Sequence, residues 1–184
     1  MDRTNEAVAR DLARHIRTVP DFPKPGVSFK DITPLIESGD ALHAAVDALA
    51  HATEDLHYDL ILSAEARGFV FGTALAYSAR KGLVLARKPN KLPRETISAS
   101  YDLEYGADAL EAHADAIPPG ARLLITDDLL ATGGTARAMC QLVENSGGTV
   151  AGVAFLIELA YLNGRSRLTP YDVISLITYH DPDE

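Results

Sequence analysis

Short apolar runs alternate along this chain with longer segments of helical periodicity. Five runs have the length and composition of buried strands: 60–62, 83–86, 123–125, 150–157 and 173–177. Amphipathic helices are predicted at 40–55, with Asp40 as its N-cap, and at 69–80 and 135–144. This alternation predicts an α/β fold, with a mainly parallel twisted sheet flanked by helices on both faces.

Two segments do not follow the alternation. Residues 21–34, DFPKPGVSFKDITP, contain three prolines, which exclude a regular helix and predict a rigid irregular segment packed against another part of the chain. Residues 88–106, KPNKLPRETISASYDLEYG, form a polar connection too long for an ordinary turn. We expect an active-site lid there, in which TISASYDLEY can pair as a hairpin; the alternative is a flexible loop without a function.

The start of the chain, residues 1–16, predicts an amphipathic helix with Val8, Leu12 and Ile16 on one face. It lacks the apolar core of a secretory signal, so a cytoplasmic location is expected. No apolar run approaches the ~18 residues of a membrane span, which argues against a membrane protein. A length of 184 residues fits one domain, 1–184.

Charge and composition narrow the classes of partner. The apolar content of 47% is that of a globular protein, and a net charge of −9 argues against a nucleic-acid surface. The single cysteine, Cys140, cannot form an intramolecular disulfide, and we expect an inert buried thiol. The six histidines are scattered without the spacing of metal ligands.

Positive charge is concentrated directly after the run 83–86. Arg87, Lys88, Lys91 and Arg94 lie within a short stretch of an otherwise acidic chain. A solvated loop is the ordinary explanation of such a cluster. Ligands of open parallel sheets bind at the carboxyl ends of the strands, however, and this position favours an anion-binding role.

The segment 123–136, LLITDDLLATGGTA, combines a strand, two acids and a glycine-containing helix start. Gly133 and Gly134 allow close approach of the main chain, and the free N–H groups of the following helix favour a phosphate. Asp127 and Asp128 are acceptors that suit hydroxyl groups. The combination indicates a ribose 5-phosphate, with a divalent metal nearby, although a structural turn with acids as helix caps is the alternative. Neither G-x-G-x-x-G nor a Walker A lysine is present.

These segments carry a family resemblance. ITDDLLATGGTA resembles the phosphoribosyl diphosphate motif of the type I phosphoribosyltransferases. FPKPGVSFKDIT, SAEARGFVFG and RKPNKLPRETISASYDLEYG resemble, in the same order and over nearly the full length, the members that act on adenine. The resemblance implies the type I phosphoribosyltransferase fold, with a hood at about 1–36 that binds the base and a lid at about 88–106.

The implied activity is Mg²⁺-dependent transfer of a phosphoribosyl group from 5-phosphoribosyl 1-diphosphate to adenine, giving AMP and diphosphate in purine salvage. Asp127 and Asp128 would hold the ribose hydroxyls and stabilise an oxocarbenium-like transition state. Glu104 would handle a proton of the purine, and Tyr105 would pack over the closed site. The 5-phosphate would be held by Ala131, Thr132, Gly133, Gly134 and Thr135.

The resemblance also assigns the diphosphate and the base. The diphosphate would meet Arg67, Arg87, Lys88 and Lys91. Adenine would stack on Phe29, with main-chain groups from Val27 to Lys30 at its edge. Substrate oxygens and water would supply most Mg²⁺ ligands, without a cage of side chains.

Two departures from the family pattern stand out. The family often has Arg where this chain has Lys30, which cannot make a planar bidentate contact, so base affinity is expected to change. It commonly has Gly where this chain has Asn90, a residue that tolerates left-handed geometry. A homodimer is expected from the family.

Three alternatives stay open: a transferase for another purine such as xanthine or guanine, a non-catalytic regulator that senses 5-phosphoribosyl 1-diphosphate, and a structural α/β domain without a ligand. A regulator is expected to carry an added DNA-binding domain or a basic surface and to be able to lack the lid acid. We expect neither addition in this chain, and it contains Glu104.

Overall fold

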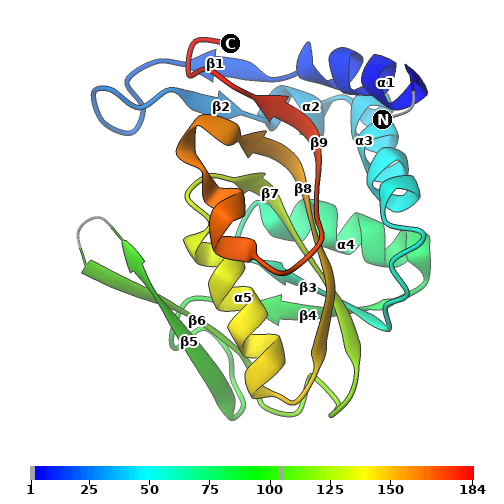
Figure 1. Ribbon diagram of the computed structural model, residues 1–184, viewed down its shortest axis with the longest axis vertical. Coiled ribbons are helices and arrows are strands. Elements are labelled where there is room, and N and C mark those ends of the chain that lie inside the picture. Colours follow the sequence, from blue (N-terminus) through cyan, green and yellow to red (C-terminus); the bar gives the residue numbers. More distant parts are fainter. Residues whose placement is uncertain (1–2, 104–105) are drawn as a thin grey trace.

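The computed structural model describes residues 3–103 and 106–184, and a five-stranded parallel sheet forms its centre (Figure 1). The strands lie in the order β4-β3-β7-β8-β9, and every neighbouring pair is parallel. Their bounds are β3 Leu60–Ala64, β4 Gly82–Ala86, β7 Arg122–Leu130, β8 Thr149–Leu159 and β9 Val173–Tyr179. This is the parallel sheet predicted from the apolar runs.

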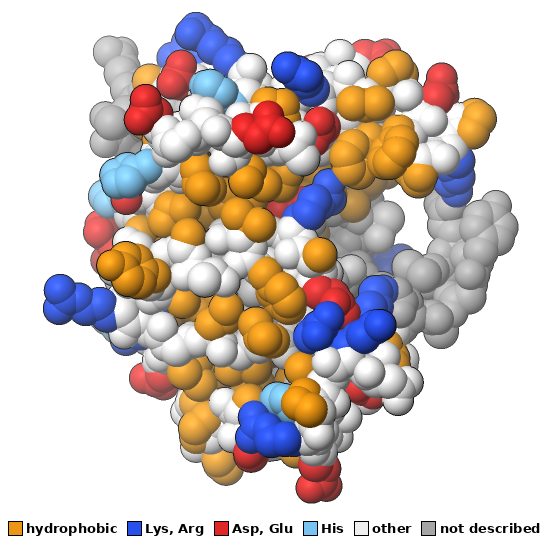
Figure 2. Space-filling model, turned by 180° about the vertical axis from the view of Figure 1, so that it is seen from behind, with side chains coloured by type: hydrophobic (Ala, Val, Ile, Leu, Met, Phe, Trp, Pro, Cys, Tyr) orange, Lys and Arg blue, Asp and Glu red, His pale blue; other side chains and the backbone are white. Residues whose placement is uncertain are grey.

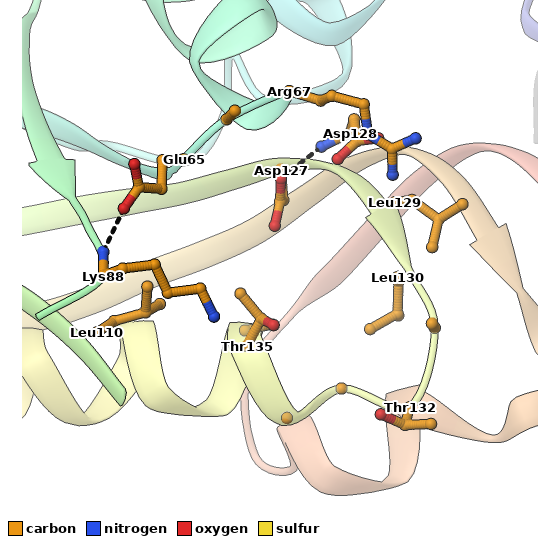
Figure 3. Close-up of a pocket in the computed structure, with 15 residues that line it drawn as sticks. Glu65, Arg67, Lys88, Leu110, Asp127, Asp128, Leu129, Leu130, Thr132 and Thr135 are labelled. Atoms are coloured by element: carbon orange, nitrogen blue, oxygen red, sulfur yellow. Dashed lines mark hydrogen bonds and ion pairs between the residues drawn. The ribbon is translucent and has the colours of Figure 1, made fainter. Parts of the chain in front are cut away.

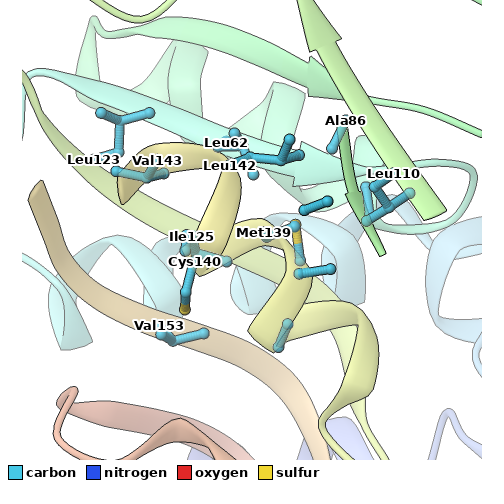
Figure 4. Close-up of a cluster of buried hydrophobic side chains, with 14 of the residues drawn as sticks. Leu62, Ala86, Leu110, Leu123, Ile125, Met139, Cys140, Leu142, Val143 and Val153 are labelled. Carbon is cyan, nitrogen blue, oxygen red and sulfur yellow. The ribbon is translucent and has the colours of Figure 1, made fainter. Parts of the chain in front are cut away.

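Helices cover both faces of the sheet, as predicted. On one face, α3 Gly39–Ala52 and α4 Gly68–Ala79 pack with α1 Arg3–Ala13 against Ile61 and Leu124. On the other face, α5 Gly134–Asn145 packs against the neighbouring residues Leu62 and Ile125 (Figure 4). Successive strand residues therefore enter opposite cores, because side chains alternate along a strand.

A hood built from the N-terminal part lies across the end of the sheet. Strand β1 Arg17–Val19 pairs antiparallel with β2 Phe29–Asp31, and α2 Thr33–Glu37 follows. The prediction of an irregular segment at 21–34 is wrong for Phe29–Asp31, which pairs with Arg17–Val19 earlier in the chain. It is also wrong for Thr33 and Pro34, which form the start of α2, where the missing N–H of proline is tolerated. The prolines Pro23 and Pro25 lie between the two strands, where no ladder N–H is required.

A hairpin projects from the body beside α5 (Figure 1). Strand β5 Thr96–Leu103 pairs antiparallel with β6 Gly106–His113, so the hairpin continues beyond the predicted lid, 88–106. Its base is joined to the end of β4 by reciprocal main-chain hydrogen bonds between Arg87 and Glu111, 2.8 and 2.7 Å long. Ala99 and Leu110 enter the core under α5. The function of a lid remains a prediction, and Glu104 and Tyr105 lie outside the described residues.

Two boundaries differ from the predictions in ways that affect the site. Strand β7 extends to Leu130, because its ladder with β8 continues to the pair Leu130↔Glu158. Asp127 and Asp128 therefore lie within a strand and not in the loop after it. The predicted cap Asp40 lies in the first turn of α3, and Ser38 is the N-cap, whose hydroxyl accepts a hydrogen bond from Ala41 N at 3.3 Å.

Between β8 and β9 the chain forms two short 3₁₀ turns, η1 Ala160–Leu162 and η2 Gly164–Leu168. They bring residues from the carboxyl end of β8 back toward the start of α5. Across the described part of the chain, no helix is both long and apolar enough to cross a membrane.

Candidate active site

A cavity of about 410 Å³ opens at the carboxyl ends of β3 and β7 (Figure 3). Parallel sheets bind ligands at this edge. The described residues that line it are Glu65, Ala66, Arg67, Lys88, Leu110, Asp127, Asp128, Leu129, Leu130, Ala131, Thr132, Gly133, Gly134, Thr135 and Ala136. It therefore brings together most of the residues that the sequence predicts for the sugar phosphate and the diphosphate.

Residues 131–135, here called the phosphate loop, run from the end of β7 into the first turn of α5 along one wall of this cavity. Gly133 precedes the helix with φ +83°, a left-handed conformation that favours glycine. Lys88 reaches from the opposite wall toward Thr135 (Figure 3). The N-terminus of α5 presents main-chain N–H groups there, and with Lys88 they make this end of the cavity suited to an anion.

Asp127 lies against the start of α4. A Cβ atom on Gly68 would be only 2.4 Å from Asp127 Oδ1, so no larger residue fits beside this carboxyl group. The same oxygen accepts a hydrogen bond from Asp128 N at 2.9 Å. Burial raises the pKa of Asp127 well above its usual value, and the charge of Asp128 adds to the rise. The ionised form of Asp127 is therefore destabilised in the protein alone, and hydroxyl donors of a ligand would stabilise it.

Asp128 has a different partner, because the side chains of consecutive strand residues point to opposite sides. Its Oδ2 forms an ion pair with Arg67 Nε at 3.0 Å, and only 7% of the Asp128 side chain is exposed. Arg67 is the N-cap residue of α4 and remains 39% exposed at its side chain. A ligand that binds either group therefore changes the electrostatics of the other.

Glu65 was not predicted from the sequence, although it directly follows β3, which extends two residues beyond the predicted strand 60–62. Its carboxylate accepts hydrogen bonds from Lys88 N and from Arg87 Nε and Nη2, the last two at 3.1 and 2.9 Å. Burial alone would raise the pKa of Glu65, but these hydrogen bonds outweigh it and lower the pKa. Glu65 thereby fixes the main chain from which Lys88 enters the cavity.

The same contacts engage the side chain of Arg87. Its guanidinium group is held by Glu65 and by the main-chain oxygen of Lys91, with Nη1 at 3.1 Å from that oxygen. Neither Arg87 nor Lys91 is among the described residues that line the cavity. Of the predicted diphosphate contacts, the structure brings Arg67 and Lys88 together.

A second cavity of about 510 Å³ lies under the hood and shares a wall with the first. The shared residues are Arg67, Leu129, Ala131 and Thr132. The rest of its described lining consists of 24–30 from the hood and of Leu159, Tyr161, Leu162 and Pro182. It includes the predicted base-binding residues Val27, Phe29 and Lys30.

Phe29 is held from two sides. The ring of Phe22 packs edge to face against it, with the centroids 5.0 Å apart and an interplanar angle of 74°. The guanidinium carbon of Arg67 lies 5.0 Å from the centroid of the Phe29 ring. These contacts fix the orientation of an aromatic surface at the boundary between the two cavities.

Lys30 holds the C-terminal segment with its ammonium group. The residue is 1% exposed, and Nζ donates to Thr18 Oγ1 at 3.0 Å, to the Pro182 carbonyl at 3.2 Å and to the main-chain oxygen of Glu184. Nζ also lies 4.3 Å from the centroid of the Tyr179 ring. Burial lowers the pKa of Lys30, opposed by the nearby carboxylates of Glu184 and Asp183. The departure from the family's Arg thus falls on a residue that anchors the wall of the second cavity.

Leu159, Tyr161 and Leu162 were also missed from the sequence. They follow the predicted strand 150–157 and line the second cavity. Ligands bind at the carboxyl ends of parallel strands, and this rule, already applied to the basic cluster, would have identified them. Pro182 was missed as well, and its main-chain oxygen accepts hydrogen bonds from the distant residues Ser28 and Lys30.

Comparison with known proteins decides the family. The sequence model of the phosphoribosyl transferase domain matches residues 36–181. An adenine phosphoribosyltransferase of Rubrobacter xylanophilus is 71% identical over 178 residues, covering 96% of each chain. The chain belongs to the adenine phosphoribosyltransferase family. The family and the activity predicted from the sequence are thereby confirmed.

Solved structures of this family have the same fold. The adenine phosphoribosyltransferase of Thermoanaerobacter pseudethanolicus superposes with a TM-score of 0.92 at 51% identity, covering 93% of this chain and 99% of its own. That of Saccharomyces cerevisiae, solved with adenine and an imino-altritol bisphosphate, gives a TM-score of 0.87 at 36% identity and the same coverage. The predicted fold class is confirmed.

Proposed function

We propose that this protein transfers the phosphoribosyl group of 5-phosphoribosyl 1-diphosphate to adenine, releasing AMP and diphosphate. The observation that carries the proposal is the pair of adjoining cavities. The first is polar and contains the phosphate loop, whose main-chain N–H groups suit an anion, and the second is lined by the ring of Phe29 in a fixed orientation. A reaction that joins a sugar phosphate to a flat aromatic base needs these two environments side by side.

In this proposal the phosphate loop holds the 5-phosphate with main-chain N–H groups and the hydroxyls of Thr132 and Thr135. Asp127 and Asp128 accept hydrogen bonds from the ribose hydroxyls. When the bond between C1 and the diphosphate breaks, the sugar gains positive charge that the ground state lacks. The two carboxylates then stabilise the transition state more than the bound substrate, which is what accelerates the step.

Arg67 and Lys88 are the proposed contacts of the departing diphosphate, since both line the first cavity. Arg87 and Lys91 remain proposed contacts at the base of the lid. No three acidic, histidine or cysteine side chains gather into a metal site within the described ranges, 3–103 and 106–184. The two aspartates nevertheless offer carboxylate oxygens, which fit a Mg²⁺ ion ligated mainly by substrate oxygens and water. Such an ion would neutralise charge on the diphosphate.

Adenine is proposed to stack on Phe29, with the main chain of Val27 to Lys30 reading its edge. An acceptor facing the amino group of adenine would be left unpaired by a 6-oxopurine, at a cost of about 1–3 kcal/mol for a buried group. Glu104 is the proposed group that handles the purine proton, and Tyr105 is proposed to cover the closed lid.

The remaining proposals concern the whole chain. Residues 1–184 form one phosphoribosyltransferase domain in the cytoplasm, with the hood at 1–36 and the lid at 88–106. Two copies associate as a homodimer, which predicts a solution mass of about twice the 19.7 kDa chain. Multi-angle light scattering measures that mass, and a single-chain mass at micromolar concentration would contradict the dimer.

Product analysis tests the activity. The protein is incubated with Mg²⁺, 5-phosphoribosyl 1-diphosphate and one of adenine, hypoxanthine, guanine, xanthine or orotate, and the nucleotide formed is identified. We expect AMP from adenine and little product from the other bases. Absence of AMP would refute the proposal, and equal use of hypoxanthine would refute the specificity for adenine.

A further inference from the structure

The turn η2 touches the outer side of the phosphate loop through main-chain atoms. A Cβ atom on Gly164 would lie 2.1 Å from the Ala131 carbonyl oxygen and 3.0 Å from Gly133 N. Conversely, a Cβ atom on Gly133 would lie 2.5 Å from the Gly164 carbonyl oxygen. The two main chains therefore meet at two glycines, and neither position has room for a side chain.

Arg165, the next residue of the turn, is fixed by a buried acid. Its Nε donates to Glu158 Oε1 at 3.0 Å, and its Nη2 donates to Glu158 Oε2, so the pair is bidentate. Only 6% of the Glu158 side chain is exposed. Ser175 Oγ donates to Glu158 Oε2 at 2.7 Å, and Arg165 Nη1 donates to the Val173 carbonyl at 2.7 Å. The guanidinium group thus ties the turn to both β8 and β9.

Glu158 links this ion pair to the start of the phosphate loop. Glu158 lies opposite Leu130 in the register of β7 and β8, and Leu130 is the last strand residue before the phosphate loop. The strand ladder therefore fixes where the loop begins, while the ion pair fixes the turn against which the loop rests. Among the described residues that line the two cavities, Gly164 and Arg165 do not appear.

We propose that Gly164 and Arg165 are positioning residues for the 5-phosphate: the Arg165–Glu158 ion pair holds the Gly164 main chain against residues 131–133 and so sets the geometry of the phosphate loop. This inference rests on the proposed function, because it takes the phosphate loop to bind the 5-phosphate. Main-chain N–H donors cannot adjust by changing a rotamer, so their alignment depends on the packing behind them.

The structural alternative is that the ion pair only stabilises the fold. The two roles differ in which ligands they affect. A positioning role weakens ligands that carry a 5-phosphate far more than it weakens adenine, although Ala131 and Thr132 also border the second cavity. A loss of folded protein instead lowers every activity together.

Two variants test the proposal. Gly164→Ala forces the turn away from Ala131, and Gly39→Ala is its control, because a Cβ atom on Gly39 meets nothing within 4 Å. Arg165→Lys keeps the charge beside Glu158 but loses the bidentate geometry, and Arg167→Lys, an exposed residue of the same turn, is its control. Calorimetry gives Kd for AMP and for ribose 5-phosphate, and steady-state kinetics give KM for adenine at saturating 5-phosphoribosyl 1-diphosphate.

We expect Gly164→Ala to weaken binding of AMP and ribose 5-phosphate by about 10- to 100-fold, the scale of effect of a ~1 Å displacement of a positioning group, with a much smaller change in KM for adenine. Arg165→Lys should show a smaller loss of the same kind, and both controls should match the wild type. If Gly164→Ala does not fold, Arg165→Lys decides the question. Unchanged AMP affinity, or an equal loss for adenine, would overturn the inference. Failure of the wild type to form AMP would instead refute the proposed function.

Discussion

Asp127 and Asp128 are consecutive residues with different surroundings. Asp128 is paired with Arg67, whereas Asp127 is packed against Gly68 and hydrogen-bonded to the Asp128 main chain. The charge of Asp128 is therefore compensated in the protein, while that of Asp127 is costly until a ligand supplies donors. This difference leads to two separate expectations.

Asp127→Asn should stabilise the ligand-free protein at neutral pH while lowering its activity. A raised folded-state pKa means that the wild type is stabilised by protonation and loses that contribution as pH rises through the folded pKa. The asparagine does not titrate, so its advantage should be largest at neutral pH and vanish near the ordinary carboxyl pKa of ~3.9. Thermal melts of both proteins across pH measure this, with a gain of about 2–4 °C for each kcal/mol. A constant difference at all pH values would contradict the explanation.

Asp128→Asn should lower kcat by about 10²-fold, the effect of removing one preorganised transition-state contact. Binding of AMP should weaken far less, since the product carries no oxocarbenium charge. Steady-state kinetics and AMP titration on the same preparation separate the two effects. Equal losses in kcat and in AMP affinity would mean that this carboxylate does not act on the transition state.

At the scale of elements, the seating of α4 on the sheet determines where Arg67 lies. The helix approaches β3 closely at Gly72, where a Cβ atom would lie 2.6 Å from Ser63 Cβ and 2.7 Å from Ser63 Oγ. Helix and strand are thus held at a distance that only glycine allows. Because Arg67 is the N-cap of this helix, its ion pair with Asp128 depends on the same seating.

Gly72→Ala should therefore lower the free energy of unfolding by about 1–3 kcal/mol through overpacking. Denaturant titration measures the loss, and Gly39→Ala, which lies in open space at the start of α3, serves as the control. A stability equal to that of the wild type would show that helix α4 can shift freely on the sheet. In that case Arg67 would not be fixed by the packing of its helix.

At the scale of the whole molecule, most of the architecture followed from local periodicity. The runs 60–62 and 83–86 became parallel strands. The first is apolar throughout because β3 is covered on both faces, whereas the edge strand β4 leaves Leu85 exposed. Strand β7 was predicted too short, because Asp127 and Asp128 are rare in strand interiors and are tolerated here by a site. The family resemblance predicted which ligands bind, and the pattern of strands and helices predicted the edge of the sheet at which they bind.

What the sequence did not predict depends on contacts between distant residues. Lys30 pairs with Pro182 across 152 positions, and Arg87 pairs with Glu65 only because β3 and β4 lie side by side. The contacts that both charged side chains make within the protein were not predicted. Pairings of this kind follow from sheet order and register, which periodicity alone does not specify.

The common wall of the two cavities has a consequence for the design of inhibitors. Arg67, Leu129, Ala131 and Thr132 border both spaces, so fragments bound to each would lie within the span of a short tether. Joining a phosphate mimic to a purine mimic makes the second association intramolecular, and its effective concentration is then set by the tether. A stiff tether of matching length would retain that gain, whereas a long flexible one would lose it.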